Sequence, residues 1–150
     1  MPEDPRKAIL GTWRLVHSIE VGPNGEKHYP FGEDAIGYIT YAESGVMAVQ
    51  ITKKVRPKGG PEPVAGKKDY LAYFGQYRLD IENAVVHHEL EGQLFPGDHP
   101  NDLKRKYHFR GETFAQTRRR HEPGDPLAAF VRLAGEMLGG LAGASGGSIR

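Results

Sequence analysis

The segment Thr12–Val21, TWRLVHSIEV, alternates between two kinds of side chain, and this alternation decides the expected fold class. One face of the extended chain carries Trp13, Leu15, His17, Ile19 and Val21. Strict alternation is typical of a β-strand with one buried face, because successive strand residues point to opposite sides. The turn residues GPNGE that follow end the strand.

The same period continues along the chain in three hairpins. IGYITYAESGVMAVQI (36–51) turns at 43–45, YFGQYRLDIENAVVHHELEGQLF (73–95) turns at 82–83, and KRKYHFRGETFAQTRRR (104–120) turns at 111–112. The spacing predicts a mainly β chain, an antiparallel up-and-down barrel of eight strands. We place this barrel at about residues 9–121 of a single domain that spans residues 1–150.

Two segments depart from the strand pattern. Residues 126–142 carry apolar side chains at helical spacing, after Asp125 as N-cap and Pro126 at the first helical position, and this predicts a C-terminal helix. The glycine-rich tail 143–150 is predicted to be disordered. The Pro/Gly/Lys-rich segment Lys53–Lys68 is predicted to be a long mobile loop near the barrel opening.

Composition excludes several classes of protein. Lys and Arg (20) nearly cancel Asp and Glu (19), so no net field favours nucleic acid or an anionic membrane. The absence of cysteine excludes disulfides and thiolate metal sites. No secretory signal begins the chain, and no apolar run is long enough to span a membrane. We therefore expect a cytoplasmic protein without nucleic-acid or membrane partners, and a homodimer is left open.

The adjacent histidines in VVHHELEGQLF (85–95) raise the question of a metal site. Neighbouring strand residues point to opposite faces, so His87 and His88 cannot meet at one metal ion. His88 shares its parity with the apolar residues Val86 and Leu90, whereas His87 shares it with Glu89. The pattern predicts His88 inside the barrel and His87 in solvent, with no metal and no cofactor.

Parity also selects other polar residues for the interior. The strand alternation assigns His17, Tyr77, Arg105 and Tyr107 to the inward face. In the 36–51 hairpin both faces are apolar, so parity does not decide, and Tyr38 and Gln50 are only guesses for the interior. Together with His88, these residues form the predicted ligand-binding set, a mainly apolar interior with a few polar groups.

Several segments resemble one family. GTWRLV (11–16) resembles the Gly-x-Trp signature of lipocalin and related calycin barrels, and segments 30–51, 70–80 and 85–96 are similar to the bacterial and fungal lipocalin-like domain family. The resemblance covers about residues 9–112. It implies an eight-stranded barrel with an internal cavity, in which Trp13 plugs the closed end beneath an arginine of the last strand. Arg118, or one of the two arginines after it, is the predicted partner of Trp13.

Three functions remain open at this point. The favoured hypothesis is a binding protein that holds a small hydrophobic or amphipathic molecule in the barrel cavity. The alternative is an isomerase or cyclase that acts on a natural-product intermediate of secondary metabolism, with His88 or a tyrosine as acid or base. A second alternative is haem binding, in which an inward histidine supplies an axial ligand. Whether the chain is an enzyme stays open.

Overall fold

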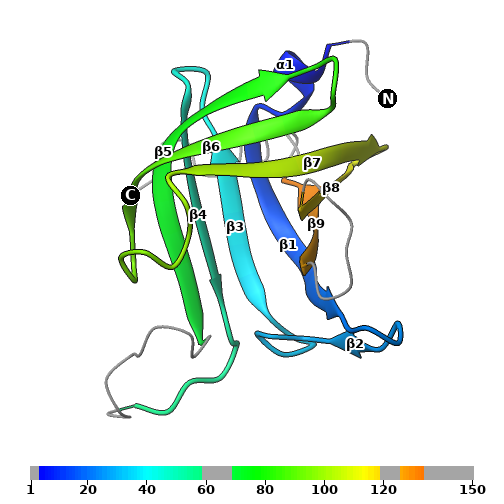
Figure 1. The fold of residues 1–150 in the computed structure, drawn as a ribbon, viewed down its shortest axis with the longest axis vertical. Coiled ribbons are helices and arrows are strands. Elements are labelled where there is room, and N and C mark those ends of the chain that lie inside the picture. The colour runs from blue at the N-terminus through cyan, green and yellow to red at the C-terminus, as the bar shows by residue number, and fades with distance from the viewer. Residues whose placement is uncertain (1–3, 59–68, 119–125, 134–150) are drawn as a thin grey trace, which may run out of the picture.

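The strands form one antiparallel sheet that closes on itself (Figure 1). The computed structural model describes residues 4–58, 69–118 and 126–133. Its elements are α1 (Pro5–Ala8), β1 (Gly11–Val21), β2 (Lys27–His28), β3 (Ile36–Tyr41), β4 (Val46–Thr52), β5 (Tyr70–Asp80), β6 (Val85–Gln93), β7 (Asp102–Arg110), β8 (Thr113–Arg118) and β9 (Pro126–Arg132). From β3 to β9, consecutive strands pair with each other. β1 pairs with both β3 and β9, which closes the barrel, and the two-residue strand β2 pairs with the end of β1. The predicted eight-stranded antiparallel barrel is confirmed.

Alternation along β1 holds through its first half and then shifts. Trp13 and Leu15 are buried, whereas Arg14 and Val16 are exposed. The pairing of β1 with β9 is irregular between Leu15 and His17, and beyond this point Ser18 and Ile19 are both buried. An irregularity of this kind inserts one residue into the ladder and changes which side chains share a face.

The three hairpin turns lie where the sequence predicts them. Gly45 between β3 and β4 and Gly111 between β7 and β8 have φ of 93° and 57°, a region that glycine enters without a steric cost. Ala84, between β5 and β6, has φ of 54° although it is not a glycine. Short turns of this kind hold consecutive strands side by side, and this makes the barrel an up-and-down meander.

β9 corrects the prediction for the C-terminal segment. Residues 126–132, the start of the predicted helix 126–142, form a strand that pairs with β8 on one side and β1 on the other. The alanines and the helical spacing favour a helix locally, but a strand here satisfies two ladders of backbone hydrogen bonds and closes the barrel. Residues 134–142 of the predicted helix, the tail 143–150 and loop residues 59–68 lie outside the described residues.

One end of the barrel is closed by α1 and the chain that follows it (Figure 1). Trp13 is fully buried and its indole nitrogen donates to the carbonyl of Ile9 at 2.9 Å. The guanidinium stacked on the indole belongs to Arg132, 4.3 Å from the ring centroid, and not to Arg118 as predicted. Because β9, the last strand in the described residues, pairs with β1, Arg132 lies directly opposite Trp13, whereas Arg118 lies opposite Arg105.

The core changes composition along the barrel axis. Aromatic rings fill the α1 end, with Phe114 at 5.1 Å from Trp13 and 4.9 Å from Phe109 between ring centroids. The opposite end, where β2 and residues 53–58 lie (Figure 1), has more aliphatic side chains in its interior. These include Val49, Ile51, Leu71 and Leu90. The candidate site lies between the two regions. Within the described ranges, no helix is long and apolar enough to cross a membrane.

Candidate ligand-binding site

His88 lies at the centre of a polar cluster inside the barrel. It is fully buried on β6, and each of its ring nitrogens is hydrogen-bonded to a tyrosine hydroxyl. Nε2 lies 2.7 Å from the hydroxyl of Tyr41 at the end of β3, and Nδ1 lies 2.8 Å from the hydroxyl of Tyr73 on β5. Gln116 on β8 donates to the Tyr41 hydroxyl at 2.6 Å. We call Tyr41, Tyr73, His88 and Gln116 the His88 cluster.

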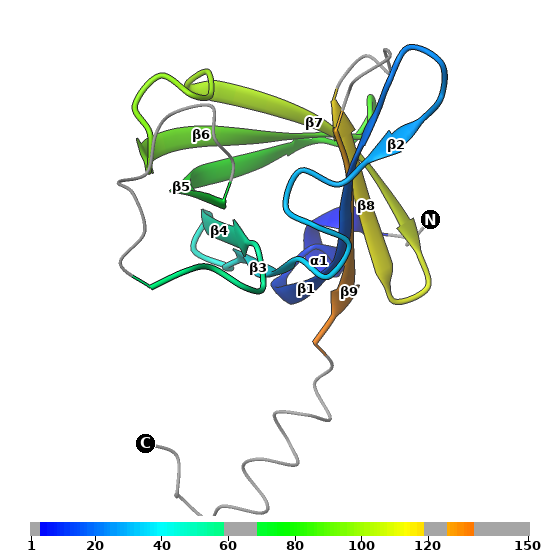
Figure 2. The same cartoon turned by 90° about the horizontal axis from the view of Figure 1, so that it is seen from below.

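The barrel topology brings this cluster together. Its members come from β3, β5, β6 and β8, and only β5 and β6 pair directly with each other. Viewed from the end opposite α1, the strands form a ring around the interior (Figure 2), and inward side chains from separate strands meet across it. Tyr77 packs against this cluster, edge-on to Tyr41 with ring centroids 4.9 Å apart, and donates its hydroxyl to the carbonyl of Ala42 at 2.9 Å.

The His88 cluster is uncharged near neutral pH. Burial lowers the pKa of His88 to about 3, with a smaller contribution from the positive charge of Arg105. Burial raises the pKa of Tyr73 to about 12, against the opposing effect of Arg105, and burial raises the pKa of Tyr41 well above its usual value. The cluster therefore offers neutral hydrogen-bond donors and acceptors rather than charges.

Two predicted site residues, for which the alternation gave no orientation, lie on the outer face. Tyr38 is 51% exposed, and its cross-strand neighbour Gln50 is exposed as well, where it accepts a hydrogen bond from the Tyr70 hydroxyl at 2.6 Å. Because Val49 and Ile51 point inward, the residue between them must point outward. Tyr38 and Gln50 are therefore surface residues, and both guesses for the interior are wrong.

The other predicted residues lie around the cluster at different levels. Tyr107 is 5% exposed and its ring packs against Phe109, toward the α1 end. Arg105 belongs to the inward row of β7, is partly buried, and donates to the carbonyl of Lys104 at 3.3 Å. His17 is partly buried. In the described part of the chain, the His17 Nδ1 atom and the Tyr107 hydroxyl are buried without a hydrogen-bond partner.

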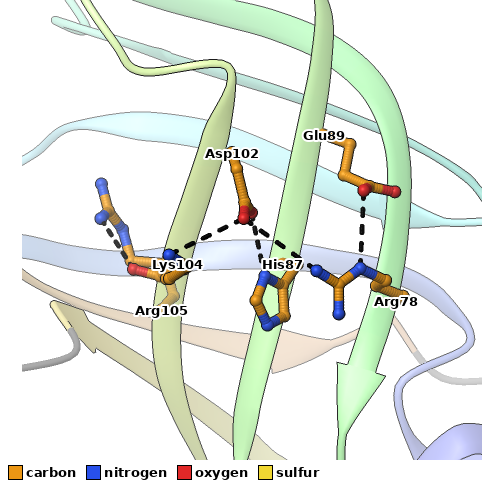
Figure 3. Close-up of polar contacts among 6 residues, drawn as sticks. All are labelled: Arg78, His87, Glu89, Asp102, Lys104 and Arg105. Atoms are coloured by element: carbon orange, nitrogen blue, oxygen red, sulfur yellow. Dashed lines mark hydrogen bonds and ion pairs between the residues drawn. The ribbon is translucent and has the colours of Figure 1, made fainter.

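His87 points out of the barrel but does not lie in solvent, which corrects the prediction. It is 8% exposed, and its Nδ1 lies 2.9 Å from the Asp102 carboxylate (Figure 3). The carboxylate also pairs with Lys104 at 3.8 Å and with Arg78 at 4.0 Å, and Arg78 pairs with Glu89 at 3.5 Å (Figure 3).

This outer network affects the acidity of Asp102. Burial raises the pKa of its carboxyl, but the hydrogen bond and charge of His87, with the charges of Lys104 and Arg78, outweigh this effect and lower the pKa overall. A shallow, polar depression beside the network is lined by Gln76, Glu89, Leu90, Glu91, Asn101 and Asp102. Within the described residues, no group of three or more histidines and carboxylates is arranged to hold a metal ion.

Three members of the His88 cluster were missed from the sequence. Tyr73 shares its parity with Tyr77 on the same strand, so extending the alternation by four residues would have placed it inside. Tyr41 lies in the hairpin where both faces are apolar, and no local pattern assigns its face. Gln116 follows Phe114 by two residues, and this parity was the only signal available for it.

The haem hypothesis does not fit the surroundings of His88. An axial ligand needs a ring nitrogen with a free lone pair. Both nitrogens of His88 are engaged by tyrosine hydroxyls, and aromatic rings surround them, with Tyr41 and Tyr73 each 5.6 Å from the imidazole between centroids. His88 is therefore held as a hydrogen-bonding group within the cluster rather than presented to an iron.

The closed antiparallel up-and-down barrel is the architecture of a calycin-type protein. The chain matches the model of the lipocalin-like domain family over residues 10–127 and belongs to that family. Membership supports small-molecule binding in a barrel as the general function, without naming a ligand.

Similar solved structures agree in coverage but are distant. A redesigned β-barrel matches 86% of this chain and 95% of its own length at 9% identity, with a TM-score of 0.46. The Echinococcus granulosus fatty-acid-binding protein 1 matches 85% of this chain and 99% of its own length at 14% identity, with a TM-score of 0.43. Neither likeness is close enough to bear on the function of this chain. No match to a curated protein was found.

Proposed function

We propose that this chain binds a small, mostly apolar molecule inside the barrel, in contact with the His88 cluster. The observation that carries the proposal is the cluster itself, in which a fully buried histidine is held by two tyrosine hydroxyls. Burying polar groups costs free energy that an all-apolar core would avoid. A few placed polar groups in an apolar wall are typical of small-molecule sites, where they orient the ligand.

The composition of the interior supports an apolar ligand. The inward side chains between the cluster and the end opposite α1 are mainly aliphatic, and Leu71 among them is only partly buried. Partly buried aliphatic side chains gain free energy when a ligand covers them, at about 25 cal/mol for each Å² removed from water. The ligand would enter from this end, because Trp13 and Arg132 occupy the other.

Binding accounts for the cluster better than the alternative of an isomerase or cyclase. A general base works best when its pKa lies near the working pH. Burial holds the pKa of His88 at about 3, so the imidazole is a weak base in this environment. It is well suited to orient hydrogen bonds, because its protonation state does not change across the neutral range.

Blocking the interior tests the proposal. Leu71→Trp places an indole at an inward position on β5, next to Ile51, whereas Ala72→Trp places the same side chain at the outward position beside it. We expect the wild type and Ala72→Trp to bind the neutral fluorescent probe Nile red, and Leu71→Trp to bind it at least about tenfold more weakly, about 1.4 kcal/mol. Native mass spectrometry of the wild type would identify any co-purified ligand. Equal binding by both variants would contradict the proposal.

A further inference from the structure

The hydrogen bonds of the His88 cluster leave one hydrogen of its two tyrosines and histidine without an acceptor. Three bonds link its four side chains, Gln116 to Tyr41, Tyr41 to His88, and His88 to Tyr73. Gln116 donates the first bond. Each of the other two bonds needs one donor hydrogen, and three hydrogens are present, one on each tyrosine hydroxyl and one on the neutral imidazole. One of these three hydrogens therefore remains.

The remaining hydrogen is on a tyrosine in either tautomer of the histidine. If Nδ1 carries the hydrogen, it donates to Tyr73, Nε2 accepts from Tyr41, and the hydroxyl hydrogen of Tyr73 is left over. If Nε2 carries it, Tyr41 accepts from both His88 and Gln116, Nδ1 accepts from Tyr73, and the hydroxyl hydrogen of Tyr41 is left over. A buried donor without an acceptor costs about 1–3 kcal/mol.

The surroundings favour the tautomer that leaves the hydrogen on Tyr73. In that arrangement all three bonds run in one direction, from Gln116 through Tyr41 and His88 to Tyr73, so each bond polarises the next. Tyr41 is 1% exposed and enclosed by the rings of Tyr77 and Phe114. Tyr73 is 7% exposed and lies in the first half of β5. β5 begins at the end of the barrel opposite α1 (Figure 1), where a ligand would enter.

We propose that the Tyr73 hydroxyl donates this hydrogen to a carbonyl oxygen of the ligand, so that the ligand is a neutral apolar ketone, aldehyde or ester rather than a fatty acid. This inference rests on the proposed function and names the ligand class of the same site. A carbonyl oxygen accepts the hydrogen without bringing a charge into the interior, whereas a buried carboxylate requires a cation as partner. The cation that acts on the cluster, Arg105, already donates to the carbonyl of Lys104 and makes a further interaction.

Competition against Nile red with three compounds of equal chain length tests the ligand class. The compounds are a long-chain methyl ketone, the corresponding fatty acid and the corresponding alkane. We expect the wild type at neutral pH to prefer the ketone over the alkane by about fivefold to tenfold, the scale of one hydrogen bond. We expect the fatty acid to bind more weakly than the ketone. A fatty acid that binds more tightly than the ketone overturns the inference.

Matched tyrosine variants locate the hydrogen bond. Tyr73→Phe should lose the preference for the ketone and keep its affinity for the alkane, which also demonstrates that the variant is folded. Tyr70→Phe is the control, because Tyr70 is on the same strand and its hydroxyl bonds to Gln50 on the surface, so the preference should remain. A preference that persists in Tyr73→Phe overturns the inference.

Infrared spectroscopy gives a readout that does not depend on a folded variant. The carbonyl stretch of the bound ketone in the wild type should lie at lower frequency than in an alkane solvent, and an unshifted stretch overturns the inference. The outcomes also separate the two proposals. If the wild type binds neither Nile red nor the alkane, the proposed function fails. If it binds both without preferring the ketone, only the inference about the ligand class fails.

Discussion

Arg132→Ala should destabilise the barrel by about 3 kcal/mol, because one guanidinium joins the last strand to the beginning of the chain. Its carbon lies 4.3 Å from the ring centroid of Trp13, Nη1 donates to the carbonyl of Leu10 at 3.0 Å, and Nη2 donates to the carbonyl of Ala8. Its Nε also lies 3.6 Å from the carboxylate of Glu112.

The magnitude follows from these contacts. A cation–π contact at a partly buried site contributes about 1 kcal/mol. A hydrogen bond from a charged donor contributes about 1.5 kcal/mol, and Arg132 makes two of them to carbonyls. The pair with Glu112 adds almost nothing, because that side chain is 71% exposed and water screens the interaction. The Arg132 side chain is 30% exposed, so water replaces part of what is lost, and about 3 kcal/mol remains.

Urea unfolding followed by the fluorescence of Trp13, the single tryptophan, measures this loss. Arg132→Lys keeps a charge near the ring but not the planar fork, and should recover about half of the lost stability. Arg110→Ala, at an exposed position of β7, is the control and should change stability by less than about 0.5 kcal/mol. A loss below about 0.5 kcal/mol for Arg132→Ala, or no difference between the alanine and lysine variants, would refute the reasoning.

Three further predictions concern the histidines and the outward residues. The stability of the wild type should fall as pH decreases from about 6.5 to about 3, because His88 binds a proton in the unfolded state but stays neutral in the folded state. The free energy of unfolding should decrease by at most about 1.4 kcal/mol per pH unit. Urea unfolding at several pH values should give a flatter slope for His88→Gln, and an unchanged slope would count against the buried neutral histidine. His87→Ala should cost about 1–2 kcal/mol of stability through the lost bond to Asp102, while Nile red affinity stays the same; a loss of affinity without a loss of stability would place His87 in the binding site. Tyr38→Ala and Gln50→Ala should leave Nile red affinity within about twofold of the wild type, as measured by fluorescence titration, because both side chains point outward; a larger change would reverse the assigned face.

Much of the barrel could be predicted from local patterns. The period of two identified the strands of each hairpin, and the turn residues located their ends at 43–45, 82–83 and 111–112. The same period gave the inward orientation of His88 and Tyr77, because each of these strands has one apolar and one polar face. It gave no orientation for β3 and β4, where both faces are apolar, and there the guesses for Tyr38 and Gln50 were wrong.

The residues around His88 in the candidate site were harder to predict than His88 itself. His88 was found, but two of its direct partners and Gln116 were not, because hydrogen bonds across a barrel join residues that are far apart in sequence. Tyr41 and His88 are 47 positions apart, and Gln116 and Tyr41 are 75 positions apart. Local periodicity specifies a face of a strand, but it does not specify which side chains meet across the interior.

The sequence by itself determined the class of fold, strands β1 and β3 to β8 and the turns of the three hairpins, because strand period and turn chemistry act over a few neighbouring residues. Only the tertiary structure decided the last strand, its arginine and the burial of His87. Residues 126–132 carry a helical pattern, yet they lie between β8 and β1, whose free edges require backbone partners. His87 has the outward parity that its strand predicts, yet Asp102 of the neighbouring strand comes within 2.9 Å of it. Strand neighbours and barrel closure depend on the whole chain, and no local pattern contains them.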